Sequence, residues 1–146
     1  MKTTIELNGQ PVEITLTEAQ VAEDRQKISG YKEIKTVDDA FSFLGMDYGK
    51  WIVQHKDLPE DVQAYMQLTY IAKAINGGEW MDYSDTSVNK YFPWFHASGS
   101  ASGFSCVDYG YGRSNSLVSS RLCFKTREMA IYAGKQFLDI YNQYIN

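Results

Sequence analysis

Two short runs near the start of the chain, residues 4–7 and 12–16, alternate between apolar and polar side chains. Strict alternation is typical of a strand that buries one face. Asn8 and Gly9 lie between the runs, and this pair supplies the positive φ values that a tight turn between two strands requires. The pattern therefore predicts a β-hairpin at the N-terminus.

Helical spacing of apolar residues predicts four helices after the hairpin. A hydroxyl can cap the first turn of three of these helices, at Thr17, Thr36 and Thr126. Pro59 lies at the start of another, where its missing N–H would have no helical hydrogen-bond partner. Glycines follow the first three runs and are placed to end them. The helices are expected over about residues 18–28, 37–44 and 59–77, and from residue 127 to near the C-terminus.

Residues 80–111 hold nine aromatic side chains among 32 residues, twice the density of the whole chain. Aromatic residues in short runs between glycine and serine clusters favour strands. Three antiparallel strands are the economical arrangement for this region. We predict them at residues 91–96, 104–111 and 121–125, joined by a mobile loop at 97–103 and a polar connection at 112–120.

Together these elements predict an α+β fold. It comprises an N-terminal hairpin, about three helices, a three-stranded antiparallel aromatic-rich sheet, and a C-terminal helix packed on that sheet. Gly134 in the last helix permits a close approach to the sheet. A chain of 146 residues fits one domain. We expect a single domain over 1–146, with the hairpin and helices in 1–78 and the sheet and final helix in 79–146.

Alternation along the second predicted strand separates its side chains into two faces. Phe104 and Cys106 fall on one face, and Val107, Tyr109 and Tyr111 fall on the other. We expect the first face to pack against the helices. Tyr109 and Tyr111 would then direct their hydroxyls toward water.

Charge and composition argue against several classes of protein. Residues 1–73 carry 8 Lys/Arg against 12 Asp/Glu and residues 74–146 carry 6 against 6, which gives the net charge of −4. Non-specific nucleic-acid binding needs clustered Lys and Arg, so it is not expected. No apolar run reaches the roughly eighteen residues that span a bilayer, and the N-terminus lacks the layout of a secretory signal. We therefore expect a cytoplasmic protein with no membrane partner.

Candidate catalytic groups are few. Either cysteine, Cys106 or Cys123, would form a nucleophile and base with His96, yet nothing around them matches a known nucleophile motif. Burial is the commoner state of a free cysteine, so catalysis is the weaker interpretation, and the exposure of the Cys123 thiol is left open. The histidines and cysteines lack the paired spacing of a zinc site. The Gly/Ser stretch 97–103 lacks the Lys-Ser/Thr ending of a phosphate-binding loop, so no catalytic residue, metal or cofactor is predicted.

Three of the four arginines, Arg113, Arg121 and Arg127, lie close in sequence to the aromatic strands. Arginine beside exposed Tyr or Trp is typical of protein interfaces and of nucleotide pockets, because both use planar stacking and forked hydrogen bonds. Most of the aromatic rings must fill the core, so only those on an outward face are available for binding. The predicted binding residues are Trp94, His96, Tyr109, Tyr111, Arg113 and Arg121.

Several motifs of the second half resemble a family of small uncharacterised proteins from gut-bacterial phages and prophages. The motifs are YFPWF at 91–95, SGF at 102–104, SSRLCFKT at 119–126 and YAGKQF at 132–137. The likeness extends over most of the chain and includes the opening hairpin and helix. It implies a phage or prophage origin and a setting in the host cytoplasm or the virion, and it brings no assigned activity.

Three hypotheses about function follow. The favoured one is a non-enzymatic protein-binding module that acts on a host or phage protein through the outer face of the aromatic sheet. The second is a pocket for a nucleotide or another small anionic ligand, with Arg113 and Arg121 as charge partners. The third is a hydrolase that uses a cysteine. Pairing of two copies through a flat aromatic sheet is also open.

Overall fold

In the computed structural model, the described residues are 2–7, 10–15, 17, 30–97 and 103–146. The helix predicted at 18–28 and most of the predicted loop at 97–103 lie outside them. The chain divides into two compact units, Met1–Gly30 and Tyr31–Asn146, and each is described by itself. The expectation of a single domain stays a prediction.

The first unit contains the predicted hairpin. Strand β1 (Lys2–Leu7) pairs antiparallel with β2 (Gln10–Thr15), and Ile5 lies opposite Val12 in this register. The strand prediction is therefore confirmed for this unit.

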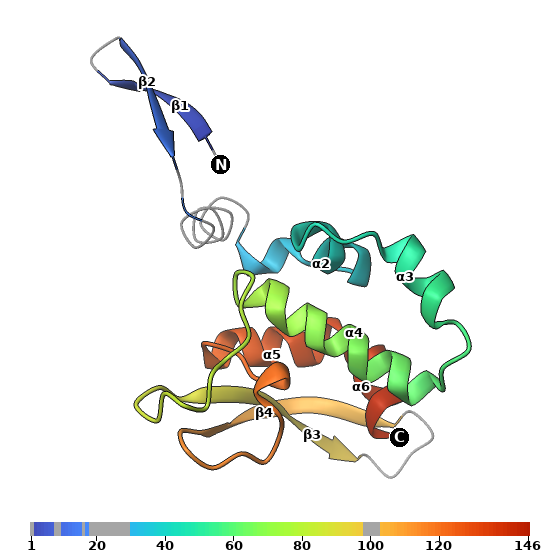
Figure 1. The fold of residues 1–146 in the computed structure, drawn as a ribbon. Coiled ribbons are helices and arrows are strands. Elements are labelled where there is room, and N and C mark those ends of the chain that lie inside the picture. Colours follow the sequence, from blue (N-terminus) through green and yellow to red (C-terminus); the bar gives the residue numbers. More distant parts are fainter. Residues whose placement is uncertain (1, 8–9, 16, 18–29, 98–102) are drawn as a thin grey trace. The chain divides into compact units, whose positions relative to one another are not determined.

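The second unit combines helices with an antiparallel two-stranded ribbon, so the α+β class is confirmed (Figure 1). Its helices lie on one side of the ribbon, with α5 against both strands. Helix α4 packs on α6 and also on α2. The elements in chain order are η1 (Tyr31–Glu33), α2 (Val37–Phe43), α3 (Tyr48–His55), α4 (Glu60–Ile75), β3 (Lys90–Ala97), β4 (Phe104–Gly112), η2 (Ser120–Leu122), α5 (Arg127–Gln136) and α6 (Leu138–Ile145), where η is a single 3₁₀ turn.

The helix starts follow their caps. Thr36 accepts a hydrogen bond from the amide of Asp39, and the Asp39 carboxylate accepts one in return from the amide of Thr36, which is a complete capping box at α2. Thr126 caps α5 through the amide of Met129. These starts confirm the sequence prediction. Helix α3, which Asp47 caps, was not predicted.

The predicted third strand at residues 121–125 is wrong. Residues 120–122 form the turn η2, and only Phe124 makes a β-bridge, which joins it to Tyr91. Leu122, Cys123 and Phe124 are all buried, so burial does not alternate along these three residues. The described part of the second unit therefore contains a two-stranded ribbon with one extra bridge, instead of three full strands.

The side chain of Asn76 occupies the place where a further strand would pair. It lies at the end of α4, is fully buried, donates from Nδ2 to the carbonyl of Cys123 over 2.8 Å, and accepts at Oδ1 from the amide of Lys125 over 2.9 Å. A carboxamide carries a donor and an acceptor side by side, like a peptide group. Phe124 is thus held between the backbone of β3 and the Asn76 amide.

The predicted C-terminal helix is two helices, α5 and α6. They meet at Phe137, whose φ of −108° and ψ of 29° leave the helical region. The apolar stripe expected along this segment, Ala130, Ala133, Phe137, Ile140, Tyr141 and Tyr144, is confirmed in part. Four of its residues are buried, whereas Ile140 is half-buried and Tyr144 is exposed. The break redirects the chain while most of the stripe stays in the core.

Close packing of α5 on the ribbon depends on Gly134. A Cβ atom there would lie 2.6 Å from Cys106 Sγ and 2.7 Å from Pro93 Cβ, distances that real Cβ atoms do not adopt. The prediction for Gly134 is confirmed. The same distances place Pro93 and Cys106 on the helix side of the ribbon.

A β-bulge in the ribbon corrects the predicted faces of β4. Trp94 pairs with Asp108, whereas the next residue, Phe95, pairs with Cys106, so Val107 is an extra residue. One extra residue reverses the alternation beyond it. Tyr109, paired with Pro93, therefore shares the helix side with Cys106 and packs against the core. The expectation that Tyr109 and Tyr111 lie on the outward face is wrong. Tyr111 pairs with Tyr91 and so falls on the same side as Tyr109, although its ring stays exposed.

Replacing Asn76 tests how much its two hydrogen bonds stabilise the fold. Asn76→Ala leaves a buried carbonyl and a buried amide without partners, so we expect the free energy of unfolding to fall by about 2–4 kcal/mol. Urea unfolding followed by circular dichroism measures it. Asn115→Ala, at an exposed asparagine, is the matched control and should change stability by less than about 0.5 kcal/mol. Equal stability of the two variants would contradict this role for Asn76.

Candidate functional site

The side of the ribbon opposite α5 carries the exposed Trp94, and further large apolar side chains of this region are exposed as well. Trp94 is 52% exposed, Val107 59% and Leu117 78%. Isolated apolar residues are normal on a surface, but a cluster of them marks a contact surface. These residues come from β3, from the bulge of β4 and from the segment that follows β4.

A shallow hollow of about 350 Å³ lies on this surface, and we call it the Trp94 hollow. Its volume is at the lower end of the range for ligand sites. It is open to solvent, so it resembles a surface depression more than a substrate cavity. The residues that line it are Phe92, Trp94, Asp108, Tyr109, Gly110, Tyr111 and Leu117.

Phe92 and Gly110 form the floor of the hollow. The two are partners in the β3–β4 register, and a Cβ atom at Gly110 would lie 2.4 Å from the Phe92 ring. Only glycine leaves room for the ring to lie across β4. Phe92 is consequently buried although it lies on the outward face.

Among the described residues that line the hollow, only Asp108 carries a formal charge at neutral pH. It lies directly opposite Trp94 in the register, and its Oδ1 accepts a hydrogen bond from the amide of Tyr109 over 2.9 Å. Its side chain is exposed, and no described Lys or Arg lies within ion-pairing distance of the carboxylate. The carboxylate therefore gives the hollow an uncompensated negative charge.

Two of the six predicted binding residues contribute rings that are more than half exposed. Trp94 lines the hollow, and Tyr111, which is 62% exposed, lines its border with its ring centroid 6.0 Å from that of Tyr91. Tyr109 also lines the hollow, but it packs against the core with its ring 5.7 Å from that of Tyr91. His96 is exposed near the end of β3 and does not line the hollow.

The structure does not bring Arg113 and Arg121 to the hollow. Arg113 donates from Nε to Oδ1 of Asn89 over 2.7 Å. Arg121 lies over the ring of Trp80 at 4.3 Å, and Lys73 lies over the same ring at 4.4 Å. The two arginines make separate contacts on different segments, so they do not form a joint anion site.

Lys90 is a buried cation that no pattern in the sequence indicates. Its amine donates to the carbonyls of Asp85 and Arg113 and lies 5.0 Å from the centre of the Tyr83 ring. Carbonyl oxygens and an aromatic face satisfy the charge without a carboxylate. Lys90 thereby holds the segment before β3, through Asp85, and the segment after β4, through Arg113, at the end of the ribbon where Lys90 pairs with Gly112.

Neither cysteine has the environment of a nucleophile. Burial raises the pKa of the Cys123 thiol, which contacts the Tyr83 hydroxyl over 3.6 Å and the Ser119 carbonyl over 3.5 Å. Burial also raises the pKa of the half-buried Cys106 thiol. An activated cysteine needs a lowered pKa, so both thiols are protonated at neutral pH. Within the described residues, no three His, Cys, Asp or Glu side chains gather as metal ligands.

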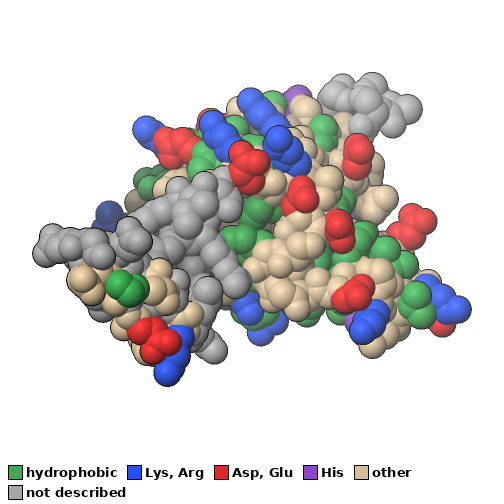
Figure 2. Space-filling model, turned by 90° about the horizontal axis from the view of Figure 1, so that it is seen from above, with side chains coloured by type: hydrophobic (Ala, Val, Ile, Leu, Met, Phe, Trp, Pro, Cys, Tyr) green, Lys and Arg blue, Asp and Glu red, His purple; other side chains and the backbone are tan. Residues whose placement is uncertain are grey.

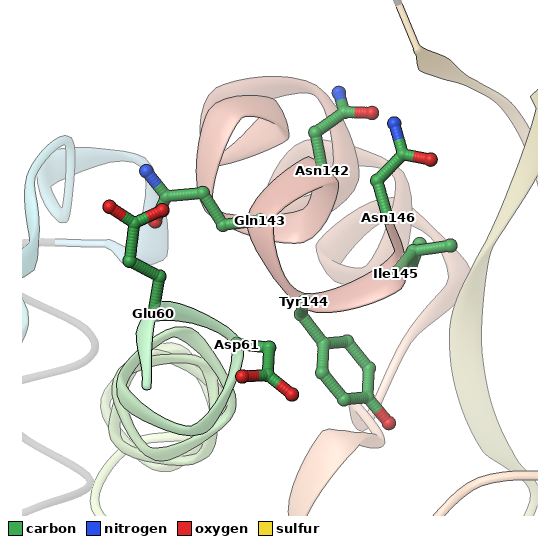
Figure 3. Close-up of a pocket in the computed structure, with 7 residues that line it drawn as sticks. All are labelled: Glu60, Asp61, Asn142, Gln143, Tyr144, Ile145 and Asn146. Atoms are coloured by element: carbon green, nitrogen blue, oxygen red, sulfur yellow. The ribbon is translucent and has the colours of Figure 1, made fainter. Parts of the chain in front are cut away.

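A second hollow, of about 690 Å³, lies between the start of α4 and the end of α6 (Figure 3). Figure 3 shows the side chains of Glu60 and Gln143 turned toward one another across its opening. Glu60 and Asp61 are in the first turn of α4, where carboxylates stabilise a helix through its dipole. Their position is explained by the helix, so this hollow gives no independent sign of chemistry.

The helix side of the second unit has a mixed surface. In Figure 2 the described Lys and Arg side chains alternate with Asp and Glu, with apolar side chains between them. This face therefore shows no patch of one sign among the described residues. The Trp94 hollow is the surface with the more distinctive composition.

Comparison of the chain with protein-family models, with curated proteins and with solved structures finds no match. None of the described helices has the length and apolar character needed to cross a membrane. Function is therefore inferred from the geometry of the described residues.

Thiol alkylation tests the account of the cysteines. Because burial raises both pKa values, we expect native protein at pH 7.5 to react with iodoacetamide at least about tenfold more slowly than glutathione does. The rate should keep rising beyond the pH at which an ordinary thiol is fully ionised. Mass spectrometry should find Cys106 modified before Cys123, and protein in urea should react at both sites at an ordinary rate. Rapid alkylation of either native thiol would contradict this account.

Proposed function

We propose that the chain is a non-enzymatic protein-binding module that contacts its partner through the Trp94 hollow and the apolar side chains around it. The observation that carries the proposal is the exposure of Trp94 on the side of the ribbon away from α5, together with that of Leu117, which lines the same hollow. Tryptophan is enriched among the residues that contribute most to protein interfaces. An open hollow with an aromatic wall is a common place for an anchoring side chain of a partner.

The environments of the other candidate groups support this choice. Both thiols have raised pKa values, which opposes a cysteine hydrolase. Arg113 and Arg121 are engaged with Asn89 and Trp80, and the charge in the hollow is negative, which opposes an anionic ligand such as a nucleotide. The sequence resemblance described above supports a phage or prophage source. The partner would then be a host protein or another component of a phage assembly.

Removal of the exposed apolar groups tests the proposal. We expect Trp94→Ser/Leu117→Ser to lose a partner that the wild-type protein captures from host lysate, with binding reduced at least about tenfold, because interface tryptophans often contribute 2 kcal/mol or more. Quantitative mass spectrometry of the captured proteins measures the difference.

Val53→Ser is the matched control, because Val53 is an equally exposed aliphatic residue on α3, away from the ribbon. It should retain the partner. Unfolding in urea should show that all variants remain folded, since each change is at an exposed position. The proposal would be wrong if the double variant captured the same proteins in the same amounts as wild type.

A further inference from the structure

We infer that the Trp94 hollow receives a cationic side chain of the partner, arginine in particular. This inference rests on the proposed function and adds the chemistry that the partner must present. It is argued from the placement of one carboxylate beside one exposed indole. Both belong to the β3–β4 ribbon, where they are paired next to the bulge, so the register of the two strands sets their spacing.

Trp94 and Asp108 are direct cross-strand partners. Residues paired in this way have Cβ atoms roughly 4.5–5.5 Å apart and project from the same face of the ribbon. Half of the Trp94 surface is exposed, and the Asp108 side chain is exposed beside it. A ligand that rests on the indole therefore also meets the carboxylate.

The negative charge of the hollow favours a positively charged ligand. Phe92, Trp94 and Leu117 offer only apolar or aromatic surface apart from the indole N–H, and Asp108 supplies the single formal charge. One carboxylate oxygen accepts the amide of Tyr109, and the remaining acceptor positions of the carboxylate face solvent. An aromatic surface beside an unpaired carboxylate attracts cations and repels phosphates and carboxylates.

Arginine fits this arrangement better than lysine. Its guanidinium is planar, so it can stack on the indole face while its N–H groups donate to the carboxylate. The protein already contains one contact between a guanidinium and an indole, since Arg121 lies 4.3 Å from the centre of the Trp80 ring. Lysine, a strongly hydrated point charge, gains less from stacking.

Short capped peptides provide the direct test, with the full chain in solution. Acetyl-Gly-Arg-Gly-amide, titrated to about 50 mM, should move the NMR signals of the Trp94 indole and of the Asp108 and Tyr109 amides, with saturation in the millimolar range. The citrulline peptide has the same shape without the charge and should bind at least about tenfold more weakly. The lysine peptide should fall between them.

Two variants separate the contributions of charge and stacking. Asp108→Asn should weaken the binding of the arginine peptide by about fivefold or more, because the charge is lost. Trp94→Ser should remove saturable binding of this peptide. Asp139→Asn, at an exposed aspartate on α6, is the matched control and should bind as wild type does. Equal binding of arginine and citrulline, or of wild type and Asp108→Asn, would overturn the inference.

The outcome also separates this inference from the proposed function. If the arginine peptide fails to saturate while Trp94→Ser/Leu117→Ser still loses the captured partner, the surface binds a protein but the cation inference is wrong. If the arginine peptide binds and the double variant keeps every captured protein, the hollow binds cations and the protein-binding proposal is wrong. Concentration-dependent dimerisation that blocks the peptide would identify a second copy as the occupant, which also overturns the inference as stated.

Discussion

The two hydrogen bonds of the buried Asn76 carboxamide are the constraint on which much of the second unit depends. They join the end of α4 to the backbone on both sides of Phe124. Phe124 in turn exchanges two backbone hydrogen bonds with Tyr91 in β3. One side chain thus connects the central helix to the ribbon through a single bridging residue. Because α5 begins three residues after Phe124, the same connection also fixes where α5 starts.

The ribbon uses two glycines to pack differently on its two sides. Gly134 of α5 lets the helix rest on Pro93 and Cys106, which closes one side. Gly110 of β4 lets the Phe92 ring lie flat across the other side, which stays open to solvent. In both places a missing Cβ allows a close contact that any other residue would prevent. The Trp94 hollow exists because the Phe92 ring lies against β4 on this side of the ribbon and none of the described helices packs over it.

The aromatic excess of residues 80–111 is divided between stability and exposure. Tyr91 and Tyr109 pack toward the core, the ring centroids of Phe95 and Tyr141 are 4.8 Å apart, and the Trp80 ring contacts both Lys73 and Arg121. Trp94 and Tyr111 are left with more than half of their surface exposed. The interior therefore absorbs most of the rings. What remains at the surface is the Trp94 indole beside the Asp108 carboxylate. The exposed indole is the basis of the function proposed for this chain.

Local signals in the sequence were enough to locate several elements. Helical periodicity and caps located α2, α4 and α5, alternation located β1 and β2, and aromatic runs located β3 and β4, because these patterns depend on neighbours within a few residues. The remaining features follow from contacts between distant segments. The Asn76 amide replaced a third strand, the bulge at Val107 turned Tyr109 inward, and the register placed Asp108 beside Trp94. Each of these depends on contacts between residues distant in the chain, and no local pattern records which partner a buried amide or a paired strand will meet.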